Sequence, residues 1–166
     1  MFEKNFKKFF WKKITKIKFR DTNEAIIYLK KKNFIISLWV EDIYKKNIKY
    51  KNYTYPVFFY RIKLTDLGLK KPSSLEKIYQ LIKKNNFQLV DPEYALLLRI
   101  IYKNQKKGEW LRIATPFNSL IDRDKVPHLP KLGKALNRYF IETYWSYKKA
   151  IFHPHNEFVV MKINET

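Results

Sequence analysis

The residues best suited to chemistry in this sequence are tyrosines and lysines that alternate between positions 44 and 55. Single-stranded nucleic acid binds where cations meet its phosphates and aromatic rings stack on its bases. This stretch supplies both groups and directly precedes a predicted strand. Its candidate binding residues are Lys45, Lys46, Lys49, Tyr50, Lys51, Tyr53 and Tyr55. The alternative is a solvated loop whose tyrosines cover the edge of a sheet.

Residues 1–20 form a second candidate binding segment. Apolar residues recur there at three- and four-residue steps, which predicts an amphipathic helix with lysines on its other faces. Lys7, Lys8 and Lys12 are its candidates for phosphate contacts. The segment also fits an ordinary helix that docks on the domain, or a helix that lies on an anionic membrane surface.

Metal and acid–base chemistry find little support. His153 and His155 stand two residues apart, so an extended segment would place both imidazoles on one side. A zinc site needs further ligands, and the sequence has no cysteine. We therefore keep these histidines only as weak metal candidates. The acidic pair at 41–42 and the acids at 122 and 124 match no metal-dependent motif, and solvated acids in turns are the better interpretation.

Composition narrows the classes of function. The 166 residues include 35 basic and 15 acidic ones, a formal net charge of +20, which favours polyanionic partners. Most basic residues are lysine, however, so part of the excess can reflect AT-rich codons. Only three glycines occur, and we find no phosphate-binding loop. We expect no cofactor. Without a membrane-spanning stretch or a secretory signal pattern, the expected location is the cytoplasm.

The elements that must position these residues follow from periodicity and capping signals. Residues 21–166 are predicted to form one α+β domain. The predicted helices are 21–33, 73–85 and 91–101, and the predicted strands are 34–40, 57–64, 109–115 and 157–163. Residues 44–56 are interpreted as a loop, and 129–147 favours strands over a helix. We thus expect a small mixed or antiparallel sheet of four to five strands with helices packed on it, preceded by the basic helix of residues 1–20.

The central third of the chain, residues 64–115, resembles a group of uncharacterised bacterial proteins. The similar segments are 66–68, 78–79, 91–93, 98–100, 102–105 and 108–114, and residues 158–160 fit a terminal strand in such proteins. The sequence departs from the group at residues 86–87 and in its lysine-rich start. The group has no assigned activity, so the resemblance implies fold context and no catalytic residue.

These observations favour a small, basic, non-enzymatic protein that binds nucleic acid, either RNA or DNA. The first alternative is a protein-interaction module with an acidic partner. A metal-dependent hydrolase that uses His153 and His155, and a protein held at a membrane surface through residues 1–20, are the further alternatives.

Overall fold

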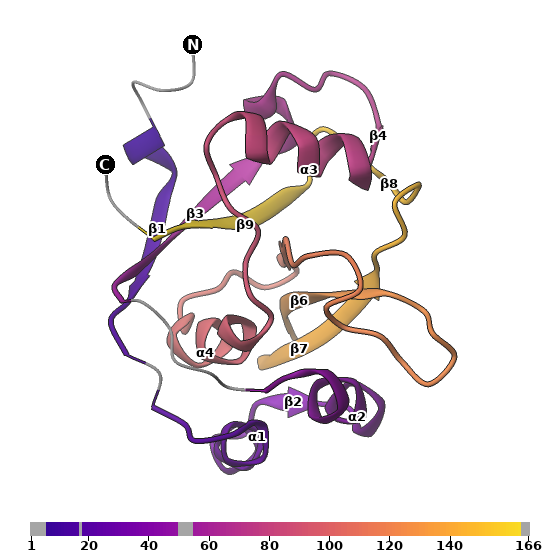
Figure 1. Ribbon diagram of the computed structural model, residues 1–166. Coiled ribbons are helices and arrows are strands. Elements are labelled where there is room, and N and C mark those ends of the chain that lie inside the picture. Colours follow the sequence, from indigo (N-terminus) through magenta and orange to yellow (C-terminus); the bar gives the residue numbers. More distant parts are fainter. Residues whose placement is uncertain (1–5, 17, 50–54, 164–166) are drawn as a thin grey trace.

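The computed structural model describes residues 6–16, 18–49 and 55–163, and these build a mixed seven-stranded sheet flanked by helices (Figure 1). The strand order is β1-β3-β9-β5-β6-β7-β2. Its strands are β1 (Phe10–Ile14), β2 (Ile35–Ile36), β3 (Val57–Lys63), β5 (Trp110–Ile113), β6 (His128–Ala135), β7 (Arg138–Trp145) and β9 (Glu157–Lys162). A separate small sheet pairs β4 (Ser73–Ser74) with β8 (Ile151–Phe152). The pairs β5·β9 and β7·β2 are parallel, and the others are antiparallel.

Helices cover the two faces of the sheet unequally. The helices are α1 (Thr22–Lys31), α2 (Leu38–Asn47), α3 (Leu75–Lys84) and α4 (Glu93–Ile101), with the short 3-10 turns η1 (Phe6–Phe9) and η2 (Leu64–Leu67). Helices α1, α2 and α4 pack on one face and enclose the larger core. On the other face, α3 and η2 enclose a second core over β3 and β9 (Figure 1). None of the helices within the described ranges is long and apolar enough to cross a membrane.

Several elements confirm the sequence-based expectations. Asp21 caps α1, because its Oδ1 accepts a hydrogen bond of 2.9 Å from the Glu24 amide. Strand β3 lies where alternation predicts it, and the terminal strand β9 lies within the predicted range 157–163. Residues 128–145 form a hairpin rather than a helix. Its turn residues Leu136 and Asn137 both have positive φ, as a tight two-residue hairpin turn requires.

The prediction of a helix over residues 1–20 is wrong for the described part of that segment. Residues 6–9 form the 3-10 turn η1, and β1 pairs antiparallel with β3 at the edge of the sheet. Neighbouring aromatic side chains then point to opposite faces. Phe10 lies 6.0 Å from the ring of Tyr60, and Trp11 lies 4.9 Å from the ring of Tyr102. The strand places the two rings against partners on opposite faces of the sheet, with Trp11 half-buried and Phe10 47% exposed, which a single helical face could not do.

The sheet is also larger than the four to five strands expected, and the region 34–56 is organised differently. Only Ile35 and Ile36 of the predicted strand 34–40 pair as a strand. Ser37 then starts α2, since its Oγ accepts a hydrogen bond from the Val40 amide. Helix α2 continues to Asn47, so the first part of the predicted loop 44–56 is helical.

Candidate nucleic-acid interface

The part of the sheet formed by β5, β6 and β7 leaves one face only partly covered. Helix α3 lies over the neighbouring part of that face (Figure 1). Tyr60 and Val160 are buried there. Beyond α3, further side chains of the same face remain partly open to solvent, and six of them form one continuous group. We call them the platform: Trp110, Arg112, Lys131, Phe140, Glu142 and Tyr144.

The first row of the platform is aromatic. Trp110 is paired across the strands with Gly133, which is paired in turn with Phe140. A Cβ atom at Gly133 would lie only 2.3 Å from the Trp110 ring, so the indole lies directly over the backbone of β6. This glycine allows Trp110 to reach across β6, where its ring centroid is 6.3 Å from that of Phe140.

The second row is charged and consists of Arg112, Lys131 and Glu142 in cross-strand register. Lys131 Nζ lies 4.7 Å from the Trp110 ring centroid and 5.7 Å from that of Tyr144. Within the described chain, neither cation forms an ion pair with a carboxylate. The Nε atom of Arg112 is buried and has no hydrogen-bond partner among the described residues.

Tyr144 forms the third row and connects the platform to β8. It is 38% exposed and lies 5.4 Å from Phe152, ring to ring. The Arg112 guanidinium lies 5.7 Å from the Tyr144 ring and 5.5 Å from the Phe152 ring. The two cations, on the adjacent strands β5 and β6, therefore lie beside aromatic rings contributed by β5, β7 and β8, an arrangement that suits stacked bases and their phosphates.

Partial burial sets the electrostatics of the charged row. Burial lowers the pKa of the Arg112 guanidinium, which Tyr144 opposes only in part. Burial also lowers the pKa of Lys131, against the opposing effect of Glu142. Burial raises the pKa of Glu142, and Lys131 counteracts this. All three charges are thus incompletely solvated, and the two cations would gain from an anionic ligand.

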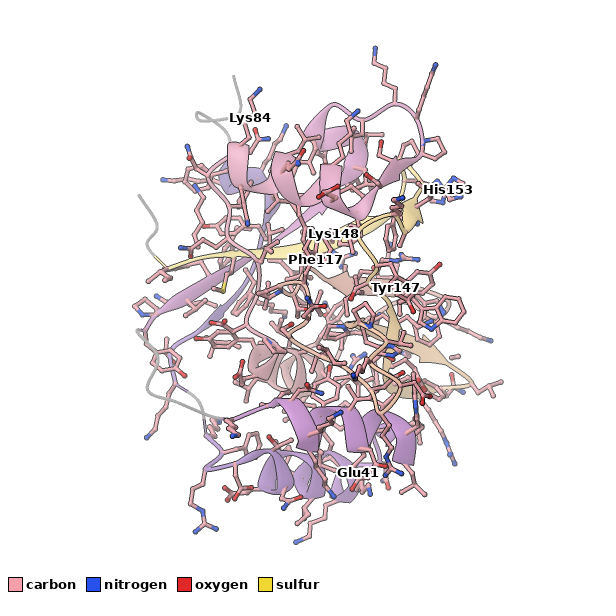
Figure 2. All side chains as sticks on the ribbon, turned by 45° about the vertical axis from the view of Figure 1, so that its right-hand side comes forward. Glu41, Lys84, Phe117, Tyr147, Lys148 and His153 are labelled. Atoms are coloured by element: carbon pink, nitrogen blue, oxygen red, sulfur yellow. The ribbon has the colours of Figure 1, made fainter. Side chains whose placement is uncertain are left out.

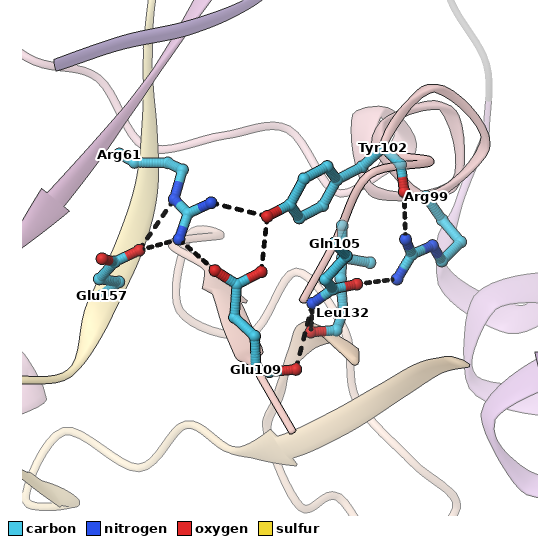
Figure 3. A network of polar contacts seen from close by, with 7 residues as sticks. All are labelled: Arg61, Arg99, Tyr102, Gln105, Glu109, Leu132 and Glu157. Atoms are coloured by element: carbon cyan, nitrogen blue, oxygen red, sulfur yellow. Dashed lines mark hydrogen bonds and ion pairs between the residues drawn. The ribbon is translucent and has the colours of Figure 1, made fainter. Parts of the chain in front are cut away.

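On the opposite face of the sheet, a network of polar side chains forms hydrogen bonds with the backbone of the platform strands β6 and β7 (Figure 3). Arg99 is fully buried, and its Nη1 donates to the carbonyl oxygens of Gly133 and Phe140 at 3.1 and 3.2 Å. These are the backbone groups of the first platform row. Gln105 accepts from Arg99 at 2.6 Å and donates to the Leu132 carbonyl at 2.9 Å. Burial lowers the pKa of Arg99 to about 10, and its partners here are neutral oxygen atoms.

The network continues to the central strands through Arg61. Arg61 Nη2 lies 2.6 Å from Glu109 Oε1, and its Nε lies 2.8 Å from Glu157 Oε2 (Figure 3). Tyr102 donates to Glu109 and accepts from Arg61. Burial and the bond to Glu109 raise the pKa of Tyr102 to about 12. These groups are satisfied by one another, so they hold β3, β5, β9 and the end of α4 together.

The binding residues predicted from sequence are dispersed. Lys45 pairs with Glu41 at 2.6 Å on α2, and Lys46 donates to the Asp122 carbonyl. Lys49 is exposed near the start of α1. Tyr55 is half-buried against the larger core. Tyr50, Lys51 and Tyr53 lie outside the described residues.

The N-terminal lysines lie elsewhere again. Lys7 and Lys8 are exposed on η1, and Lys12 is on β1 with its Nζ 6.0 Å from the Tyr102 ring. Strand β1 forms one edge of the sheet, and β2, directly before α2, forms the other. The described members of the predicted set therefore do not form one surface.

The two histidines considered as metal ligands, His153 and His155, lie beside each other with no third ligand among the described residues. The rings of His153 and His155 are stacked with centroids 5.8 Å apart, and both residues are exposed. Within the described ranges, no group of three or more His, Cys, Asp or Glu side chains lies close enough to hold a metal ion.

The interpretation of the acids as solvated residues in turns is wrong for Glu41 and Asp122, which are buried and have structural partners. Glu41 lies within α2 and pairs with Lys30 and Lys45, which lower its pKa. Asp122 is buried and hydrogen-bonded to His128 Nε2 at 3.0 Å. Its other oxygen accepts from two backbone amides in the same turn. These contacts are those of structural carboxylates.

The platform was missed as a site, although the sequence contains part of its signal. The alternation at 109–115 places Trp110 and Arg112 on the same side of a strand, opposite two aliphatic residues. The sequence alone does not predict the strand register that places Lys131, Gly133 and Phe140 beside Trp110 and Arg112.

Comparisons of the chain with protein-family models, with curated proteins and with solved structures give no match. The site's chemistry is therefore argued from its own residues.

Proposed function

We propose that this protein binds single-stranded nucleic acid, RNA or DNA, on the platform of β5, β6 and β7. The observation that carries the proposal is the arrangement of Arg112 and Lys131 beside accessible aromatic rings. Neither cation forms an ion pair within 4 Å among the described residues, although Glu142 lies opposite Lys131 and acts on it electrostatically. Acting as a binding protein in the cytoplasm is part of this proposal.

Each component of a single strand has a counterpart on the platform. Bases can stack on Trp110, Phe140 and Tyr144, at about 1–3 kcal/mol for each stacked base. Phosphates can approach Arg112 and Lys131, whose incomplete solvation favours an anionic partner. A duplex hides the faces of its bases within the stack, so aromatic rings favour a single strand.

The length of β7 suggests how much of a strand is bound. Phe140 and Tyr144 are four residues apart on one strand, or about 13 Å at the usual rise of a β-strand. Stacked nucleotides are spaced by about 3.4 Å, so this distance covers about four steps, or about four to five nucleotides. The formal net charge of +20 would speed the encounter with any polyanion.

The test is a binding titration with labelled oligo-dT and oligo-U, each about eight nucleotides long. Trp110→Ala should weaken binding about tenfold through the loss of one stacked base, and Lys131→Ala should reduce the salt slope by about 0.7. Trp39→Ala and Lys31→Ala are matched controls on the helices of the opposite face and should bind as the unmodified protein does. A salt slope near zero, or equal effects of Trp110→Ala and Trp39→Ala, would contradict the proposal.

An acidic protein segment is the second candidate, because it too would satisfy the charges of Arg112 and Lys131. Polyglutamate separates the two functions. If the partner is a protein, polyglutamate should bind comparably to the oligonucleotides and should be insensitive to Trp110→Ala. Membership in the group of bacterial proteins that residues 64–115 resemble is likewise a proposal, and it assigns no chemistry.

A further inference from the structure

A hollow of about 700 Å³ lies at the end of β7, where the chain turns toward β8. Its lining combines large apolar side chains with two lysines. The residues that matter here are Tyr144, Trp145, Tyr147, Lys148, Lys149 and Ile151. Tyr144 also belongs to the platform, so the hollow and the platform adjoin.

The exposure of these side chains is unusual for a segment this short. Trp145 is 62% exposed, Tyr147 48% and Ile151 55%. A cluster of large exposed apolar side chains marks a binding surface more often than a solvated turn. Figure 2 shows Tyr147 and Lys148 on the turn, with Phe117 beside Lys148. Lys148 Nζ lies 5.9 Å from the Phe117 ring centroid.

The turn that carries these residues is fastened by its backbone. The Ala150 and Lys148 carbonyls accept from the first amides of α3, at 2.8 and 3.0 Å. The Ser146 amide donates to the Pro127 carbonyl at 2.9 Å, and β8 pairs with β4. The hollow is therefore preformed, and a ligand would not have to order the loop on binding.

The lysines indicate which kind of ligand the apolar lining receives. The side chains of Lys148 and Lys149 are exposed and form no ion pair or hydrogen bond with other described residues. An aromatic lining with free cations suits a flat, uncharged ring attached to an anion. A nucleobase with its phosphate has this composition, and the strand proposed for the platform would deliver one past Tyr144.

We infer that the hollow between β7 and β8 receives one or two nucleotides of the strand bound on the platform, with Tyr147 stacking on a base and Lys149 contacting a phosphate. This inference rests on the proposed function and extends its site. The protein would then bind a segment longer than the platform alone can cover.

The experiment compares oligo-dT of about four nucleotides, which matches the platform, with oligo-dT of about eight. The variants are Tyr147→Ala and Lys149→Ala, with Tyr28→Ala and Lys31→Ala on α1 as controls. Tyr147→Ala should weaken binding of the longer strand about tenfold, and Lys149→Ala should weaken it severalfold. Both variants should change the affinity for the shorter strand by less than about twofold. Retained binding of the shorter strand by Tyr147→Ala excludes misfolding as the cause, and Tyr147→Phe, which keeps the ring, should restore binding of the longer strand.

The possible results separate the two proposals. Equal losses for both lengths, or no loss for either, would overturn the inference while the binding of the shorter strand still supports the platform. Failure of every oligonucleotide to bind the unmodified protein would overturn both proposals.

Discussion

Gly133→Ala should remove the Trp110 ring from its position over β6. The new Cβ would lie 2.3, 2.4 and 2.6 Å from three atoms of the ring. Carbon atoms in contact are about 3.5 Å apart, so the indole must retreat by about 1.2 Å or more. It would thereby lose its contact with Phe140, a pair of the kind worth about 0.5–1.5 kcal/mol, together with part of its burial.

The magnitude depends on whether Trp110 is present. With Trp110 in place, Gly133→Ala should lower the free energy of unfolding by about 1–2 kcal/mol. In a Trp110→Ala background no ring opposes the new methyl group. Alanine is then the better strand residue, and the substitution should be neutral or stabilising by about 0.5–1 kcal/mol. The two substitutions should therefore be coupled by about 2 kcal/mol.

The assay is urea unfolding of the four proteins of this cycle, followed by far-ultraviolet circular dichroism so that the loss of a tryptophan does not affect the signal. Each variant that displaces or removes the Trp110 ring should also bind oligo-dT more weakly than the unmodified protein does. A coupling energy below about 0.5 kcal/mol would refute the placement of the indole over Gly133.

Three further predictions address charge. Glu142→Gln should tighten oligo-dT binding about fivefold, because a carboxylate about 4 Å from a phosphate costs about 1 kcal/mol even in water. Burial raises the pKa of Glu142, so lowering the pH should neutralise it and tighten binding of the unmodified protein more than that of the variant. For Asp122, burial opposes ionisation, but bonds from His128 and two amides bring its pKa below the ordinary 3.8. Its stabilising effect is present above that value and is lost as the pH falls through the folded pKa. Asp122→Asn should therefore cost about 1–3 kcal/mol at pH 7, with a smaller difference in acid, as measured by urea unfolding. Arg61→Met leaves the carboxylates of Glu157 and Glu109 without the cation between them. Because these groups are about one-quarter exposed, the free energy of unfolding should fall by about 2 kcal/mol. Adding Glu157→Gln should recover part of this loss. A loss below about 0.5 kcal/mol would show that the network contributes little.

Local signals predicted much of the fold. The Asp21 cap, the alternation of β3 and the β-forming residues of the hairpin each depend on interactions between neighbours in the sequence. Such signals survive without knowledge of the tertiary structure. The helix start at Ser37 is also local, but it lies inside an apolar run that resembles a buried strand.

Long-range pairing explains what was missed. Phe6 to Ile14 has helical spacing, yet Phe10 to Ile14 pairs with strand β3, more than forty residues further along the chain. Its rings contact Tyr60 and Tyr102 there. The platform likewise depends on pairing among three strands. Arg112 and Lys131 become neighbours only through the β5·β6 register. Conversely, Lys45 looked available in the sequence but is paired with Glu41 one helical turn away.

Photocrosslinking with an oligo-dT strand that carries 5-bromodeoxyuridine tests the central claim most directly. If the strand lies on the open sheet face, crosslinks should map by mass spectrometry to Trp110, Phe140 and Tyr144. Crosslinks confined to residues 44–55 or 1–20, with none in β5 or β7, would contradict the account and return the binding site to the segments first indicated by the sequence.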